Sequence, residues 1–357
     1  MSLSFRYISS LYLKYFFYLF ISLECFFVII DLIKFLDDLP SSANLFILLL
    51  VYDFMYASQF ILPLALILAQ IILTVTLLKN AQFTAFLALG FARIKIFYPI
   101  FLLSFCITLS YIALNATPFA YAKERVDLII DQGFVGSYKS DLFVKYNQSY
   151  IYFKKIYPLL QSAEDIIVYE FDDRQNILTR VIESKKAQFN GQDWVLKDAT
   201  ITTLDNNLEF GKNPLEIQKR ETYEILRDFK PKILENIYEK QGSISILDAF
   251  EALVLLNSQN VNTQKIRGIL YSLIIFPFFA PLIMICLAIF IPNSNRYINL
   301  NLMVSEMILG VLITWGIFFS FSKLSMSGFL QPEFSIMVPM FILLLASSFC
   351  FYKIIKT

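Results

Sequence analysis

Ionisable side chains next to long apolar runs are the residues of this chain most able to do chemistry. Glu24 lies inside one run, Asp53 borders a second, and Glu306 lies about one turn into a third. Charges in apolar surroundings are energetically expensive, so they usually face protein or a water-filled cavity. We interpret Glu24 as a buried contact to another helix or as part of a cavity. We expect Glu306 to be hydrogen-bonded to a loop or a neighbouring helix.

Asp31, Lys34 and Asp38 are spaced by three and four residues, which places them on one face of a helix. Two interpretations fit this spacing. The aspartates and Lys34 form a local pair that solvates a helix end, or they form the polar rim of a cavity. In the second case Lys34 would bind an anionic head group as a compact point charge.

The composition excludes several kinds of site. The chain has no histidine, which removes His-dependent catalysis and His-containing zinc sites. It contains no nucleotide-binding glycine loop, and 30 basic against 29 acidic residues disfavour a nucleic-acid partner. Paired acids such as Asp172-Asp173 fall in expected turns. We therefore expect no enzyme activity, no metal site and no cofactor. The four cysteines each lie in an apolar run and are expected to be apolar filler: Cys25, Cys106, Cys286 and Cys350.

The elements that must position these residues are membrane helices. Hydrophobic residues make up 57% of the 357 residues and charged residues 17%, which is typical of a membrane protein. A spanning helix needs about 20 apolar residues. Six runs qualify: Leu11–Leu32, Phe54–Leu78, Ile96–Ala116, Ile269–Ile291, Leu302–Phe321 and Phe334–Tyr352. The first has no cleavage site, so we interpret it as a retained helix.

The region 118–265 differs from the rest of the chain. It holds 19 basic and 22 acidic residues, a net charge of −3. Runs such as Tyr150–Phe153, Ile166–Phe171 and Trp194–Leu196 have the composition of strands, and Asn190-Gly191 predicts a hairpin turn. Short, evenly spaced strands favour a sandwich or jelly roll. Ser245 and Asp248 open a capped helix that we expect to continue to Leu256.

The loop charges predict the orientation of the chain. With the N-terminus inside, no acidic residue falls in the inner loops, which hold eight basic residues: Arg6, Lys14, Lys79, Arg93, Lys95, Arg296, Lys353 and Lys356. By the positive-inside rule both termini are cytoplasmic and the β domain lies outside the cytoplasm.

A short helix is predicted between the second and third spans. Asn80 is a candidate N-cap and Gly90 a candidate for the residue after the helix. Phe83, Phe86 and Leu87 form one apolar face. This face either lies on lipid or fits a groove on a cytoplasmic motor subunit.

The layout of three helices, a β domain and three helices resembles the LptF/LptG permease family of the lipopolysaccharide export ABC transporter. The resemblance covers essentially the whole chain, and its Ile-Lys-Phe-x-Asp element is most like LptG. The matching segments are Arg6–Ile8, Ile33–Asp37, Pro63, Leu89–Phe91, Ile166–Phe171, Ala187–Phe189, Trp194–Leu196, Gly328, Pro332 and Pro339.

The resemblance implies a bacterial inner-membrane subunit with spans in 1–117 and 266–357 and a periplasmic β-jellyroll-like domain in 118–265. Paired with a homologous permease, it would bind a cytoplasmic LptB ATPase dimer and pass lipopolysaccharide or lipooligosaccharide toward LptC. ATP hydrolysis would take place in the separate ATPase chain. Lys34, Lys123 and Arg125 would bind the lipid head group. The ATPase would couple through residues of the short helix: Gln82, Phe83, Phe86, Leu87 and Gly90.

Two departures bear on these implied sites. Pro40 and Ser41 stand where LptG relatives carry further basic residues, and Gln82 replaces an acidic residue of the coupling helix. A different class of function also fits the layout. The chain would then be a membrane-anchored assembly or scaffold subunit that binds a periplasmic partner through its β domain. Co-purification with a small ABC ATPase and a second six-span homologue would distinguish the two.

Overall fold

The computed structural model describes residues 3–36, 39–40, 42–132, 139–146, 149–157, 161–171, 177–204, 216–227, 244–257, 263–293 and 299–356. The chain divides into two compact units, and we describe each by itself. The helical unit contains Met1–Val126, Ser243–Leu253 and Thr263–Thr357, and the β unit contains Asp127–Gly242 and Val254–Asn262. The helical unit thus includes residues on both sides of the predicted boundaries at 118 and 265.

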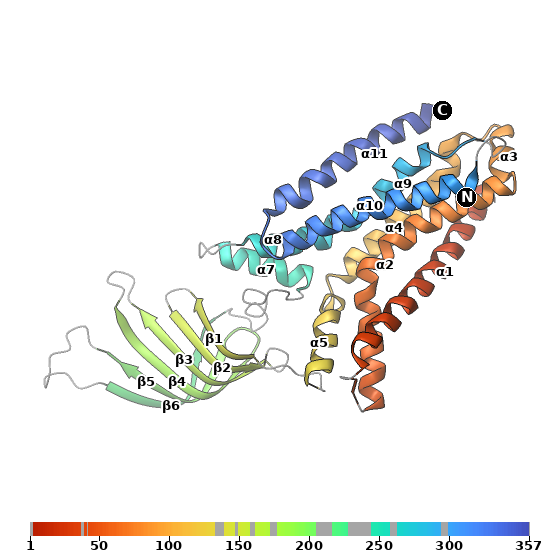
Figure 1. Cartoon of the computed structure of the whole chain (residues 1–357). Coiled ribbons are helices and arrows are strands. Elements are labelled where there is room, and N and C mark those ends of the chain that lie inside the picture. The colour runs from red at the N-terminus through yellow and green to blue at the C-terminus, as the bar shows by residue number, and fades with distance from the viewer. Residues whose placement is uncertain are drawn as a thin grey trace. The chain divides into compact units, whose positions relative to one another are not determined.

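Six helical stretches of the described chain are long and apolar enough to cross a membrane, which confirms the predicted helical membrane protein. Each contains most or all of one predicted apolar run. The stretches are α1 (Leu3–Lys34), α2 (Ala43–Lys79), α4 (Arg93–Leu114), α8 with α9 (Gln264–Ile274 and Phe279–Ile289), α10 (Leu300–Met326), and η4 with α11 (Glu333–Met337 and Val338–Lys356). Figure 1 shows both chain ends and the short helix α3 (Gln82–Ala88) at the same end of this unit.

Helix α2 is the centre of the helical unit. In its most apolar stretch 72% of residues are buried, against 22% in α1 and 11% in α10. Leu66, Ile67 and Leu73 on α2 are fully buried in the core of the unit. The helices α1 and α10 therefore leave wide apolar faces free for lipid or for another chain.

The fourth span is two helices rather than the single predicted run Ile269–Ile291. A 3-10 turn, η3 (Phe276–Phe278), separates α8 from α9. Pro277 lies in this turn, and a proline both lacks the N–H donor and crowds the preceding helical turn. Residues 275–278 therefore separate the two α-helices of this span.

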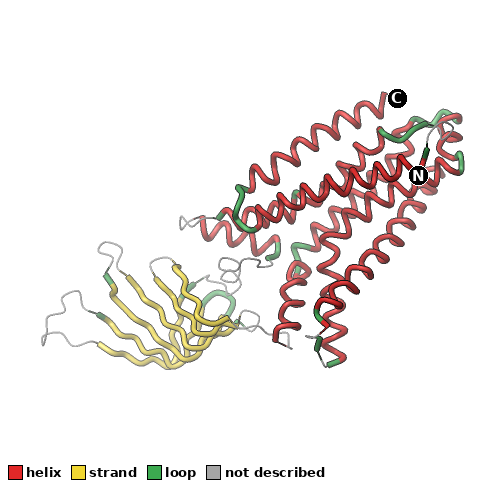
Figure 2. The backbone as a smooth tube through the Cα atoms, viewed as in Figure 1, coloured by secondary structure: helices red, strands yellow, loops and turns green. Residues whose placement is uncertain are grey.

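The β unit is one antiparallel sheet of six described strands. The strands are β1 (Lys139–Tyr146), β2 (Ser149–Tyr157), β3 (Ser162–Phe171), β4 (Leu178–Phe189), β5 (Trp194–Thr203) and β6 (Glu216–Ile225). Every pairing joins neighbours in the sequence, so the described strands form a curved meander (Figure 2). The strands predicted around Tyr150, Ile166 and Trp194 are confirmed as parts of β2, β3 and β5.

The predicted turn at Asn190-Gly191 is also confirmed, as the connection between β4 and β5. Gly191 has φ +105°, and the Asn190 side-chain oxygen accepts hydrogen bonds from the backbone N–H groups of Gln192 and Asp193, at 3.0 and 2.8 Å. Only glycine adopts that backbone conformation without strain. The predicted turns at 172–173 and 205–207 lie outside the described residues.

A charged row interrupts the alternation of buried and exposed side chains across the sheet. In each of four strands two charged, outward-facing residues separate two buried ones. The row consists of Lys154-Lys155, Glu164-Asp165, Lys185-Lys186 and Lys197-Asp198. Asp165 and Asp198 have φ of +49° and +53°, in the left-handed region, while the register of the pairs on either side of each residue is unchanged. The charged pairs therefore lie side by side on neighbouring strands.

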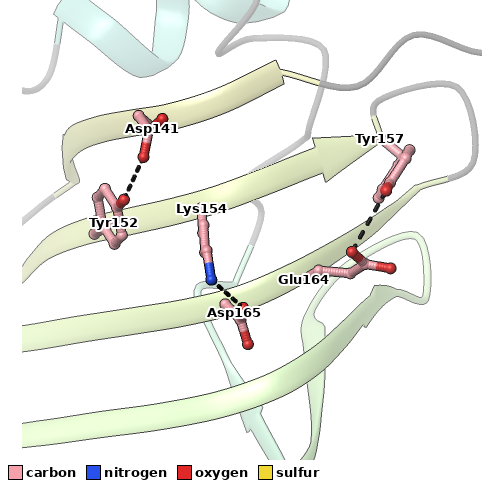
Figure 3. Close-up of polar contacts among 6 residues, drawn as sticks. All are labelled: Asp141, Tyr152, Lys154, Tyr157, Glu164 and Asp165. Atoms are coloured by element: carbon pink, nitrogen blue, oxygen red, sulfur yellow. Dashed lines mark hydrogen bonds and ion pairs between the residues drawn. The ribbon is translucent and has the colours of Figure 1, made fainter.

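Polar contacts on the exposed face join β1, β2 and β3 along this row (Figure 3). Lys154 Nζ lies 3.0 Å from the Asp165 carboxylate. The Tyr152 hydroxyl donates to Asp141, and this hydrogen bond is the main cause that raises the pKa of Tyr152. These exposed contacts link side chains of neighbouring strands.

Helix α7 (Ile246–Asn257) confirms the predicted capped helix. The Ser245 hydroxyl accepts from the Asp248 backbone N–H at 3.2 Å and donates to its carboxylate at 2.8 Å. The Ile246 N–H donates to the Asn115 carbonyl just beyond α4, at 3.0 Å. The Tyr121 hydroxyl also donates to Asp248, and burial raises the pKa of Tyr121. The start of α7 is thereby held against the end of the third span.

Candidate functional site

A row of aromatic rings runs along one face of α2. Tyr52, Tyr56 and Phe60 are spaced by four residues and are half-buried. The rings of Tyr56 and Phe60 lie 5.1 Å apart between centroids. Phe27 on α1 stacks on Phe60 at 5.8 Å, and Phe319 on α10 meets Phe60 edge-on at 5.4 Å. Three helices therefore contribute to one aromatic surface.

Three basic side chains lie over these rings. Lys123 on α5 (Ala122–Gln132) lies 5.6 Å from the Tyr56 ring centre. The Arg125 guanidinium lies 5.0 Å from the Tyr52 ring centre and donates to the Tyr52 hydroxyl. Lys323 on α10 lies 5.5 Å from the Phe60 ring centre. We call this group the basic–aromatic cluster; its residues are Tyr52, Tyr56, Phe60, Lys123, Arg125, Phe319 and Lys323.

The cluster brings together Lys123 and Arg125, which the sequence had singled out, with Lys323, which it had not. The sequence showed Lys323 only as a charge at the outer end of a span. In the described part of the chain no carboxylate lies within ion-pair distance of Lys323 or Arg125. Lys323 and Arg125 are thus half-buried cations over aromatic rings, and such cations can bind an anion such as a phosphate.

Lys34 lies apart from the aromatic rings. It forms an ion pair with Asp31, and its side chain is 60% exposed. The first of the two interpretations, a local pair at the helix end, is therefore present in the structure. Asp53 on α2 lies within electrostatic range of Lys34. Asp38 lies outside the described residues.

The remaining intramembrane acids occupy two different environments. Glu24 is fully buried, and neither of its carboxylate oxygens has a hydrogen-bond partner among the described residues. Asp53 is also buried with both oxygens unpartnered in the described chain. Glu306 is exposed on α10. The described residues contain no group of three or more His, Cys, Asp or Glu side chains that could hold a metal ion.

The short helix α3 exists, but it begins and faces differently from the prediction. Asn80 is the C-cap of α2, and the N-cap of α3 is Ala81, with φ +54°. Phe83 is fully buried and its ring lies 5.9 Å from that of Phe97 on α4. The apolar face thus packs on the protein's own helices.

The end of α3 agrees with the prediction. Gly90 has φ +82°, its N–H donates to the Leu87 carbonyl, and the Phe91 N–H donates to the Phe86 carbonyl. This is the Schellman arrangement, and the Phe86–Phe91 ring contact at 5.6 Å completes it. Gln82 accepts a hydrogen bond from Tyr7 on α1 at 3.1 Å. Leu89, the C-cap residue of α3, is a large apolar side chain that is 75% exposed.

Six membrane-spanning stretches with a β unit between the third and fourth define a multi-pass membrane protein of the permease type. The family model described as "Lipopolysaccharide export system permease LptF/LptG" matches residues 6–353. The chain belongs to this family, which is the permease component of an ABC transporter. The match does not distinguish LptF from LptG. A comparison with curated proteins finds no match.

Proposed function

We propose that the chain is a half-permease of an ABC transporter that takes lipopolysaccharide or lipooligosaccharide from the bacterial inner membrane for export. The basic–aromatic cluster is the observation that carries this proposal beyond family membership. Lys123 and Arg125 lie on α5, which follows the third span in the sequence, and Lys323 lies near the C-terminal end of α10. Phosphates of the lipid would bind Lys123, Arg125 and Lys323, and acyl chains would lie on the apolar surface below.

The relative roles of the basic residues follow from their surroundings. A half-buried cation that contacts phosphate gains a charge-assisted hydrogen bond, whereas an exposed Lys–Asp pair contributes little. Lys34 would therefore attract the head group at the rim, with part of its charge already neutralised by Asp31. Lys123, Arg125 and Lys323 would hold the head group.

A second, homologous permease would pack on α1 and α10. These helices are the least buried of the six spanning stretches. Their exposed apolar residues include Phe26, Ile29, Ile33, Ile313 and Ile317. Such apolar faces can contact either lipid or a partner helix. A lateral opening between two permeases needs a face for the partner helix and a face for the lipid. An LptC-type protein would accept the lipid from the β unit.

The ATPase would bind at the end of the helical unit that carries α3 and both chain termini (Figure 1). Leu89 and the exposed side of α3 would provide the contact, with Phe83, Phe86 and Leu87 anchoring the helix from inside. In this proposal the termini are cytoplasmic and the β unit is periplasmic.

Affinity purification in mild detergent tests the assembly. The tagged chain should recover an LptB-type ATPase dimer, one homologous six-span permease and bound lipopolysaccharide. Recovery of a periplasmic protein without an ATPase would instead support a scaffold subunit and overturn the permease assignment for this chain.

A further inference from the structure

The segment that runs from α3 to the first residue of α4, residues 82–93, is hydrogen-bonded to the end of the fourth span at two points. We call this segment the corner. Arg93, the first residue of α4, is half-buried, and its guanidinium donates to the carbonyls of Ala288 at 2.9 Å and of Ile291. On α3, the Thr84 hydroxyl donates to the Asn293 carbonyl at 3.1 Å. The partners are 195 to 209 residues apart in the sequence, so these are tertiary contacts and not local turns.

The carbonyls that Arg93 binds are chemically suited to a cation. The last carbonyls of a helix have no partner within the helix, and they form the negative end of its dipole. Ala288 lies in the last turn of α9 and Ile291 lies just beyond it. A guanidinium can contact more than one carbonyl because its donors form a planar fork.

Side-chain packing and backbone hydrogen bonds join α3 to the start of α4. Phe83 on α3 is buried against Phe97 on α4, and the turn at Gly90 is closed by two backbone hydrogen bonds. A displacement of α3 would therefore displace Arg93. At the other end of α9, the 3-10 turn η3 separates α9 from α8.

We propose that Arg93 is a positioning residue that transmits movement of α3 to α9 and so couples ATP hydrolysis to lipid movement. The inference rests on the proposed function, in which α3 contacts the ATPase. Arg93 contacts neither ATP nor lipid in this account. It acts through the end of the fourth span.

The test compares Arg93→Gln with Lys95→Gln in the complete complex, reconstituted in lipid with bound lipopolysaccharide. Lys95 is the matched control, because it is an exposed basic residue on the same turn of α4. The ATPase should co-purify with both variants. Lipid released per ATP hydrolysed should fall about tenfold in Arg93→Gln, because charge-assisted hydrogen bonds to the α9 carbonyls are lost. Lys95→Gln should match the unmodified complex.

Normal release per ATP in Arg93→Gln would overturn the role of Arg93 while leaving the proposed function intact. Failure of the unmodified chain to bind any ATPase would overturn both. These two failures are distinguished by the co-purification step, which is measured before release.

A cross-link tests the same idea without changing Arg93. With the four native cysteines replaced, Thr84→Cys and Asn293→Cys are joined by a short thiol-specific cross-linker. If the corner and α9 move together, the cross-linked complex should keep ATP-driven release. If cross-linking stops release and leaves hydrolysis unchanged, the two segments must separate during the cycle and the proposal is wrong.

Discussion

Lys323 and Lys34 carry the same charge in different surroundings, and this difference separates their roles. Lys34 is exposed and paired with Asp31, an arrangement that contributes about 0–1 kcal/mol. Lys323 is half-buried over Phe60 and Phe319, with no carboxylate in ion-pair range among the described residues. A charge-assisted contact there is worth about 1.5–3 kcal/mol.

Lys323→Gln should therefore weaken lipopolysaccharide binding about tenfold or more, and Lys323→Arg should keep most of the affinity. Removal of the charge at the rim by Lys34→Ala should weaken binding less than about fivefold. The measurement is equilibrium binding of purified lipopolysaccharide to the complex in nanodiscs. A larger loss for Lys34→Ala than for Lys323→Gln would show that the phosphate binds at the rim instead.

At the scale of elements, α3 has an inner face that anchors it and an outer face that is free. Leu89→Asp places a charge on the outer face, which we propose contacts an apolar groove of the ATPase. Burying an unpaired charge is strongly unfavourable, so ATPase co-purification should be lost while the chain still accumulates in the membrane. Leu36→Asp, on an exposed residue near the opposite end of α1, is the control and should have no effect. Retention of the ATPase by Leu89→Asp would exclude this contact.

The backbone conformation of Asp198, within the charged row of the sheet, leads to a prediction about stability. Asp198 has a left-handed backbone, which a β-branched residue adopts poorly. Asp198→Val should lower the free energy of local unfolding in β5 by about 1–2 kcal/mol, and Asp198→Gly should change it little. Lys197→Val is the neighbouring control with an ordinary strand backbone. Amide hydrogen exchange of the full chain in detergent measures all three, and equal protection of Asp198→Val and Lys197→Val would argue against a strained backbone at Asp198.

Much of this architecture could be predicted from local patterns. Apolar runs indicated the spans, and Gly90, Asn190-Gly191 and Ser245 marked ends and turns because each has a local backbone requirement. The packing of Phe83 against the chain's own helices could not be predicted. An apolar helix face does not indicate whether lipid, another protein or the same chain covers it. Lys323 was missed for a similar reason. Its aromatic neighbours come from helices far away in the sequence.

The charged row also escaped prediction. Pairs such as Lys154-Lys155 and Glu164-Asp165 break the two-residue period of a strand, and from sequence alone such a break is as typical of a turn. Only the pairing of neighbouring strands shows that the breaks lie side by side. Tertiary register, rather than local propensity, therefore decides the shape of the sheet.

At the scale of the whole molecule, the orientation of the chain is the first property to test. Cysteines are placed at Gln192, in the exposed β4–β5 turn, and at Leu89, at the end of α3, in a chain whose native cysteines are replaced. In intact cells with a permeabilised outer membrane, an impermeant thiol reagent should label position 192 and not position 89. The charge bias of the loops predicts this result, and the reverse pattern would invert the topology.

The central claim is that lipopolysaccharide passes through this chain, and photo-crosslinking tests it most directly. A photoreactive amino acid at Tyr56, within the basic–aromatic cluster, is compared with one at Ile342, an exposed position on α11. In living cells position 56 should yield an adduct that carries lipopolysaccharide and that decreases when ATP hydrolysis runs, while position 342 should yield little. An absent adduct at position 56, or equal adducts at both positions that do not respond to ATP, would contradict the account.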